Sequence, residues 1–271
     1  MNYTIQRNQP KIEKDYNDRY VEYYRYERIQ NYIAQKRESL ESLGYKIETI
    51  GKSLEGRDLY AIYPKTIDPS KETVLMFGRH HGDEGTANWI IEGFLDNYLS
   101  DFEVNSKYQL ILYPMVNPDG AENKVRYNKS GKDLNRVWDT AASRSKDEVG
   151  IIHTHLNGIY LNQNKPIIAL DMHGSFTQDF IYRVKKNYVS RDFYNKQQSF
   201  IDELARFDRW QAGNFKLSNG DPKMARIVMV KDFGINALTH ESIRDIELNN
   251  TTNRSIQSLK SQGEAIVEVT R

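Results

Sequence analysis

The sequence has 271 residues, and its 38% of hydrophobic residues suffices for one large α/β domain with a sizeable core. With 38 basic and 37 acidic residues, the formal net charge of +1 offers no global field for binding nucleic acid or an anionic membrane. The absence of cysteine excludes disulfides, cysteine-rich zinc sites and thiol nucleophiles. No stretch approaches the roughly 18 to 20 apolar residues of a membrane-spanning helix, and residues 1–10 lack a signal-peptide pattern. We therefore expect a cytoplasmic protein, or an exported one if its native N-terminus is missing here.

The first predicted element is an N-terminal helical segment. Apolar residues recur near a 3.6-residue period up to Leu43, and Gly44 ends the pattern as a C-cap. We expect residues 1–44 to pack one face on the rest of the protein. No repeat, low-complexity tract or linker divides the sequence, so residues 1–271 are predicted to form one domain.

The remaining elements alternate between strands and helices. The patterns predict, in chain order, a hairpin at 46–50 and 58–63, a strand at 73–77, a helix at 86–99, a strand at 110–116, a helix at 147–161, a strand at 166–172, a helix at 191–207, a strand at 235–239 and a helix at 255–269. This alternation indicates an α/β fold, a three-layer α/β/α sandwich around a mixed, mostly parallel sheet. Open sheets of this kind place their ligands at strand ends.

Segments with metal-binding and charged side chains follow several of these strands. The first, His81-Gly82-Asp83-Glu84, comes just after the strand at 73–77. A histidine and a glutamate three residues apart can bind one cation, and imidazole with carboxylate is a zinc-type pair. The others are Asn117-Pro118-Asp119-Gly120 leading to Asp133-Leu134-Asn135-Arg136, then Asp171-Met172-His173-Gly174, then Thr239-His240-Glu241.

A catalytic zinc takes three protein ligands and leaves one position open. We predict that His81, Glu84 and His173 supply this set, with one zinc ion per chain. His80 begins a second pair with the same spacing, but both pairs cannot face one ion. Glutamate is the longer carboxylate and a glycine beside His81 permits close approach, so His80 is expected to turn away and pack or form a hydrogen bond. Asp133 is predicted to orient a ligand imidazole by accepting its other N–H.

The ordered set of segments resembles the zinc carboxypeptidase family, the carboxypeptidase A-like metallopeptidases, over most of the chain. The resemblance rests on Ser53-Leu54-Glu55-Gly56-Arg57, Gly78-Arg79-His80-His81-Gly82-Asp83-Glu84, Asn117-Pro118-Asp119-Gly120, Arg126, Asp133-Leu134-Asn135-Arg136, Asp171-Met172-His173 and the strand leading to Glu241. Parts of it look closest to cytosolic carboxypeptidases, and murein peptide amidases share the fold and the motifs. Any one motif is common by chance, whereas the ordered set is specific.

What the resemblance implies for single residues agrees with their chemistry. Arg136, with Asn135, matches the family's clamp for the terminal carboxylate of the substrate, a task that suits a planar guanidinium. Arg126 matches the cation that polarises the scissile carbonyl and stabilises the oxyanion. Glu241 matches the general base that takes a proton from zinc-activated water and passes it to the leaving amine.

One feature departs from the family pattern. A tyrosine usually lies on a mobile loop some twenty residues before the base, yet residues 216–240 contain none. The same loop often determines side-chain specificity, and here Lys223 and Arg226 would favour an acidic group, although solvated loop charges are an equal alternative. The pair His153 and His155 lies in a predicted helix, where residues two apart point in different directions and cannot chelate together.

The predicted function is that of a zinc-dependent metallocarboxypeptidase acting on peptides or protein tails. The sequence does not separate this from a peptidoglycan stem-peptide amidase or endopeptidase on the same fold. An aspartoacylase-type enzyme is disfavoured because the segment after Glu241 looks helical rather than β-rich. A catalytically dead binding protein is disfavoured because ligands, cations and base are all present. The sequence indicates no oligomeric state.

Overall fold

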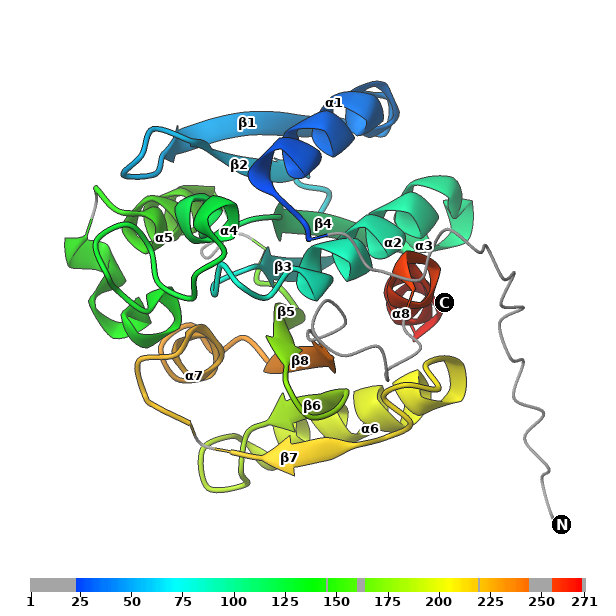
Figure 1. Cartoon of the computed structure of the whole chain (residues 1–271). Coiled ribbons are helices and arrows are strands. Elements are labelled where there is room, and N and C mark those ends of the chain that lie inside the picture. Colours follow the sequence, from blue (N-terminus) through cyan, green and yellow to red (C-terminus); the bar gives the residue numbers. More distant parts are fainter. Residues whose placement is uncertain (1–22, 145, 160–163, 219, 244–254, 270–271) are drawn as a thin grey trace, which may run out of the picture.

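The computed structural model describes residues 23–144, 146–159, 164–218, 220–243 and 255–269 (Figure 1). The first element is helix α1 (Tyr26–Ser42). Its apolar residues Ile29, Ile33 and Leu40 are buried, as the helical period predicts. Gly44 follows with a positive φ of 81°, so the expected C-cap is confirmed. The part of the predicted 1–44 segment that precedes residue 23 lies outside the described residues.

The described residues form one sheet of eight strands. They are β1 (Tyr45–Lys52), β2 (Asp58–Pro64), β3 (Glu72–Gly78), β4 (Tyr108–Tyr113), β5 (Ile168–Ser175), β6 (Phe180–Arg183), β7 (Phe215–Leu217) and β8 (Ala237–Ile243). Their order is β1-β2-β4-β3-β5-β8-β6-β7. The central strands β4, β3, β5 and β8 run parallel to one another, while β1, β2 and β6 introduce antiparallel pairs. The predicted hairpin and the mixed α/β sheet are confirmed.

Helices cover both faces of this sheet (Figure 1). They are α2 (Thr86–Ser100), α3 (Phe102–Lys107), α4 (Pro118–Asn123), α5 (Glu148–Ile159), α6 (Arg191–Phe207), α7 (Ala225–Lys231) and α8 (Ile256–Val269), with short 3₁₀ helices η1 (Leu134–Arg136) and η2 (Trp138–Ser143). One buried apolar cluster joins α1, α2, α6 and α8 to the sheet, and a second joins α5, α7 and η2 to its opposite face. Apolar residues on both sides of the central strands explain their continuous hydrophobic runs.

The sequence patterns missed the shortest elements. Strands β6 and β7 and helices α3, α4 and α7 have three to seven residues each. Elements of that length show too few turns or alternations for a period to appear. Among the described helices, none combines the length and the apolar character that crossing a bilayer requires.

Candidate metal centre and active site

The predicted site residues gather where β3, β5 and β8 end. His81 and Glu84 lie in the turn after β3, and His173 lies on β5. Strand register places Glu241 of β8 directly beside His173. Because these three strands are parallel neighbours, their carboxyl ends meet at one edge of the sheet.

The proposed ligands form one buried group. His81 Nδ1 lies 2.8 Å from one carboxylate oxygen of Glu84, and His173 Nδ1 lies 2.8 Å from the other. The two Nδ1 atoms are 3.1 Å apart. Two imidazole nitrogens and a carboxylate that converge in this way form a donor set that suits zinc.

Carboxylates also lie behind the two imidazoles. His81 Nε2 is 3.1 Å from Asp133, as predicted for an orienting carboxylate, and His173 Nε2 is 2.8 Å from Asp171. Burial alone would lower the pKa of both histidines, but the surrounding carboxylates, among them Glu84, outweigh it and raise both pKa values. A cation between the Nδ1 atoms would take the place of the protons that these carboxylates favour.

His80 belongs to a second buried group, with Asp171 and His173. His80 Nδ1 lies 2.6 Å from Asp171 Oδ1, and the indole N–H of Trp138 donates to His80 Nε2 at 3.0 Å. Both ring nitrogens of His80 are therefore used inside the protein, away from the Nδ1 face of His173. Burial lowers the pKa of His80, which favours the neutral ring.

The loop that carries His81 and Glu84 is held by a buried arginine. Arg79 has a positive φ of 64°, and its guanidinium donates to the carbonyl oxygens of Gly82 and Tyr24 and to the Asn88 side chain. The hydroxyl of Tyr23 also donates to the Gly82 carbonyl, at 2.6 Å. The segment before α1 thus helps to position the ligand loop.

Only glycine fits at position 82. An added Cβ would lie 2.0 Å from the backbone carbon of Gly120. This close approach presses the ligand loop against the segment at 117–120, whose Asn117 amide donates to the carbonyls of His80 and Arg126. The Asn-Pro-Asp-Gly motif is therefore a support for the site.

The early hairpin motif supports the same segment. The buried carboxylate of Asp119 accepts hydrogen bonds from the Ser53 hydroxyl at 2.6 Å, the Glu55 backbone N–H at 3.0 Å and the Arg57 guanidinium at 2.7 Å. Paired in this way, a buried carboxylate is stable in its charged form. These contacts connect the β1–β2 turn to the loops around the candidate metal site.

Arg126 lies beside the candidate ligands. It donates to Asp133 through two N–H groups at 2.9 and 3.0 Å, and its guanidinium is 3.7 Å from Glu84. Its side chain is 33% exposed, so one face can meet a substrate. This position suits the predicted role of oxyanion stabilisation.

The two residues predicted to clamp a carboxylate differ in accessibility. Arg136 is partly exposed, with Asp221 at 3.9 Å. Asn135 is buried, and its amide donates to Asp171 while its Oδ1 accepts the backbone N–H of Ala225. Both ends of the Asn135 amide are engaged inside the protein, in contrast to the substrate contact expected from sequence. The reason is long-range packing against the start of α7.

Arg226 is not on a solvated loop. It is buried on α7, its guanidinium donates to the carbonyl of Ser218, and it lies 5.3 Å from the centroid of the Tyr182 ring. Its Nε has no hydrogen-bond partner, and no carboxylate of the described residues pairs with it. Burial lowers the pKa of Arg226 to about 10, with Asp171, Tyr182 and Glu241 acting in the opposite direction. It is therefore a buried cation near the site.

Glu241 is partly exposed at the end of β8. Burial raises the pKa of its carboxyl to about 8, and Glu84 and Asp171 act in the same direction, while His173 and His81 oppose it. A carboxyl group that titrates near neutrality can both accept and return a proton. A nearby cation would favour its ionised form.

The other histidines lie elsewhere. His155 contacts the hydroxyl of Tyr113 at 2.9 Å, and His153 contacts Asn157, so these α5 residues serve packing as predicted. His240, next to Glu241, is buried on the opposite side of β8, 3.9 Å from Asp208.

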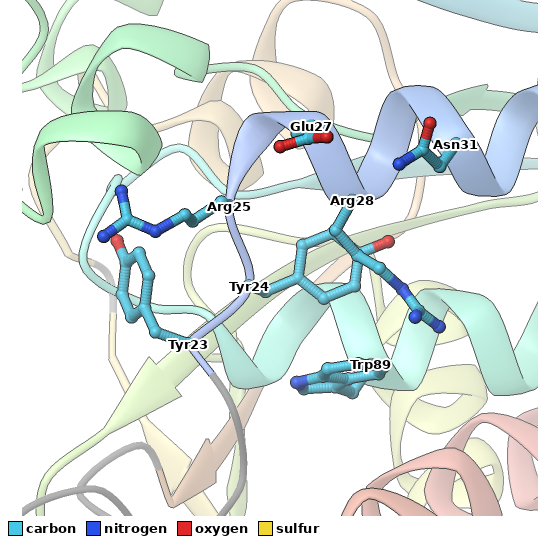
Figure 2. Close-up of a pocket in the computed structure, with 7 residues that line it drawn as sticks. All are labelled: Tyr23, Tyr24, Arg25, Glu27, Arg28, Asn31 and Trp89. Atoms are coloured by element: carbon cyan, nitrogen blue, oxygen red, sulfur yellow. The ribbon is translucent and has the colours of Figure 1, made fainter.

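A cavity of about 220 Å³ lies at the beginning of α1, apart from the predicted site residues. Figure 2 shows Tyr24 and the Arg28 guanidinium next to the indole of Trp89. Arg28 lies 4.7 Å from the Trp89 ring and forms a two-pronged ion pair with the buried Glu92. These contacts fasten α1 to α2.

The sequence motifs assigned no role to Arg79, Asp171 or Trp138, although Arg79 and Asp171 lie within them. Asp171 offered a signal, because a carboxylate two residues from a ligand histidine on one strand shares its face. No local signal pointed to Trp138, which meets His80 across 58 positions.

Comparison with known proteins agrees with this geometry. Residues 29–158 match the sequence profile of the zinc carboxypeptidase family. Over this segment the chain is similar to zinc carboxypeptidases. This family consists of zinc metallopeptidases, so the resemblance drawn from the sequence motifs is confirmed.

Curated relatives extend the match toward the C-terminus. Cytosolic carboxypeptidase 2 from Macaca fascicularis is 26% identical over 261 residues, covering 89% of this chain and 31% of the relative. The human protein of the same name is 25% identical and is covered to 29%. The chain thus spans about a third of the length of these relatives.

Solved structures share the fold of the zinc carboxypeptidase domain. A metallo-carboxypeptidase from Burkholderia cenocepacia has a TM-score of 0.74 and 19% identity, with 90% of this chain and 67% of that chain covered. A metallo-carboxypeptidase from Pseudomonas aeruginosa, in complex with (2-guanidinoethylmercapto)succinic acid, has a TM-score of 0.72 and 22% identity, with the same coverage. The three-layer α/β architecture expected from sequence is confirmed.

Proposed function

We propose that this protein is a zinc-dependent metallocarboxypeptidase that removes the C-terminal residue of peptides or protein tails and prefers an acidic side chain there. The observation that carries the proposal is the convergence of His81, Glu84 and His173, with Glu241 on the neighbouring strand. The residues present fit one zinc ion, which His81, Glu84 and His173 would hold. When bound, zinc would supply Lewis acidity and lower the pKa of water in the site.

The chain's own side chains provide the proton transfers and the positioning. The Glu241 carboxylate takes a proton from the attacking water and returns it to the leaving amine nitrogen as the peptide bond breaks. Arg126 stabilises the negative charge that develops on the carbonyl oxygen. Arg136 is partly exposed, donates to the Asn135 carbonyl at 2.9 Å and lies 3.9 Å from Asp221, which leaves other N–H groups of its guanidinium to hold the terminal carboxylate.

Two observations support a preference for an acidic residue. Arg226 is a buried cation without a carboxylate partner among the described residues, and such a charge is costly unless a ligand pairs with it. Its interactions with Asp171, Glu241 and Arg136 place it within the electrostatic reach of the site. A substrate side chain ending in carboxylate would compensate the charge.

The test uses the purified full chain loaded with zinc. Peptides that differ only in their last residue, Glu, Gln, Leu or Lys, would be offered as free acids and as C-terminal amides, together with peptidoglycan stem peptides. Mass spectrometry should show release of one residue from free acids, fastest for Glu, and none with the Glu241→Gln variant. Equal cleavage of amides and acids would instead favour the amidase or endopeptidase alternative.

A further inference from the structure

We propose that Trp138 and His80 are positioning residues for the ligand His173, acting through Asp171. These four residues form a buried series of hydrogen bonds that we call the relay. The inference rests on the proposed function, because it assigns the relay the task of directing one nitrogen of His173 at the zinc site.

The relay is continuous and excludes solvent. The Trp138 indole nitrogen lies 3.0 Å from His80 Nε2, His80 Nδ1 lies 2.6 Å from Asp171 Oδ1, and Asp171 Oδ2 lies 2.8 Å from His173 Nε2. All four residues are at most 2% exposed. The His80 and His173 rings are parallel, with centroids 5.7 Å apart. Water therefore has no access to replace any member.

The indole and the Asp171 carboxylate together determine the direction of the hydrogen bonds in the relay. An indole N–H can only donate, so His80 Nε2 must accept and its proton must reside on Nδ1. That proton is donated to Asp171 Oδ1, which leaves Oδ2 to accept the Nε2–H of His173. In the neutral, metal-binding form of His173 the lone pair is then on Nδ1, the nitrogen that faces Glu84 and His81.

Asn135 reinforces this arrangement. Its Oδ1 accepts the backbone N–H of Ala225, so its Nδ2 is the end that donates to Asp171 Oδ2, at 3.2 Å. Asp171 thus receives N–H groups from His80, His173 and Asn135. A carboxylate surrounded by three donors holds its orientation and can orient the imidazole in turn.

The same donors argue against a second metal ion in the His80, Asp171 and His173 group. The contacts of Asp171 with His80 and with His173 each already have a proton between a donor and an acceptor. Around His81 Nδ1, His173 Nδ1 and Glu84, by contrast, only acceptors converge once both rings donate through Nε2 to Asp133 and Asp171. We infer that the group of His80 and Asp171 orients His173. The group of His81, Glu84 and His173 is suited to bind the cation.

The experiment measures zinc affinity of the full chain by competition with a chromophoric chelator. Trp138→Phe removes the indole donor but keeps a ring next to Phe77, and His80→Leu removes the donor to Asp171. His80→Asn places an amide N–H near the former Nδ1 and serves as the conservative rescue. Phe77→Leu is the control, because Phe77 packs on both rings without a hydrogen bond to either.

We expect zinc binding to weaken about 10- to 100-fold in His80→Leu and about 10-fold in Trp138→Phe, the range for partners behind a metal ligand. His80→Asn should recover most of the affinity, and Phe77→Leu should lower thermal stability without changing zinc affinity. Wild-type affinity in both His80→Leu and Trp138→Phe, or an equal loss in Phe77→Leu, would overturn the proposal. Failure of the wild-type protein to bind zinc would instead refute the proposed function.

A second measurement needs no variant. Ring-nitrogen NMR of the metal-free wild-type protein should show His80 protonated on Nδ1 and bare on Nε2. A proton on Nε2 of His80 would contradict the relay even if zinc binds, because Trp138 would then have no acceptor.

Discussion

The Nδ1 and Nε2 edges of the His173 ring both face a histidine and a carboxylate, but their hydrogen bonding differs. On the Nδ1 side, His81 and Glu84 bring acceptor atoms together, whereas on the Nε2 side the indole of Trp138 gives each contact a donor and an acceptor. Histidine and carboxylate alone therefore do not define a metal site. The supply of protons, set by a residue 35 positions before His173 in sequence, distinguishes the orienting side from the binding side.

The largest effect is expected from Glu241, the proposed general base next to the Nδ1 side of His173. Glu241→Gln should keep zinc and lower kcat about 10²- to 10⁴-fold, because an amide cannot take the proton. Steady-state hydrolysis combined with atomic emission of the dialysed protein checks both parts. Near wild-type kcat in a zinc-replete variant would show that the base lies elsewhere.

Replacing a proposed zinc ligand should weaken zinc binding, whereas replacing a histidine far from the site should not. His173→Ala removes one of the three proposed ligands, so zinc binding should weaken by roughly a third of its free energy, about 3 to 5 kcal/mol. His153→Ala, on α5, is the matched control and should bind zinc like the wild type. Stoichiometric zinc retained by His173→Ala after dialysis would contradict the ligand assignment.

Changing the C-terminal carboxylate of the substrate tests the proposed role of Arg136, which is partly exposed. Amidating the C-terminus of a substrate should cost about 2 to 5 kcal/mol in transition-state binding, the range for leaving one partner of a charge pair unpaired. Arg136→Ala should impair hydrolysis of the free acid strongly and scarcely change the amide. Values of kcat/KM for both enzymes and both substrates form a double-mutant-type cycle, and additive effects would exclude a direct contact.

Replacing the buried Arg226 should have a smaller effect, limited to substrate preference. Arg226→Met should reduce the preference for C-terminal Glu over Gln by about 1 to 3 kcal/mol in kcat/KM, because a charge-assisted hydrogen bond becomes unavailable. Lys223→Met, on the loop before α7, is the control and should keep the preference. An unchanged Glu-to-Gln ratio in Arg226→Met would contradict a role for Arg226 in substrate specificity.

The smallest effect concerns pH and the metal-free protein. The raised pKa of Glu241 means that the folded state binds more protons than the unfolded state between about pH 4.5 and 8, so this group's stabilising contribution is lost as pH rises through that window. Glu241→Gln lacks this loss, so the free energy of unfolding of the variant should rise relative to that of the wild type as pH increases. Urea denaturation at pH 5 and pH 8 measures the difference, and a pH-independent gap would contradict it.

The sequence predicted long elements well and short ones poorly. Helices such as 86–99 and 191–207 have three or more turns on which a period appears, and the structure has α2 and α6 at nearly those bounds. Strands β6 and β7 depend on pairing across the sheet rather than on their own few residues. Strand β6 pairs with β8 and β7 pairs with β6, which completes the sheet beyond Glu241.

In the candidate site, too, some side-chain roles can be predicted from local sequence and others depend on contacts between distant residues. Ligand chemistry is a property of residue type and short spacing, so His81, Glu84, His173 and Glu241 could be chosen from the motifs alone. The inward orientation of Asn135 could not, because it depends on the backbone N–H of Ala225, far away in sequence.

The sequence by itself determined the zinc carboxypeptidase motifs, their order and the residue types available for catalysis, since these are written in local runs of the chain. Only the tertiary structure decided which nitrogen of each imidazole faces the site, that Arg226 is buried beside it, and that Trp138 meets His80. Those outcomes depend on strand register and on packing between distant elements, where a shift of one residue moves a side chain to the other face of the sheet.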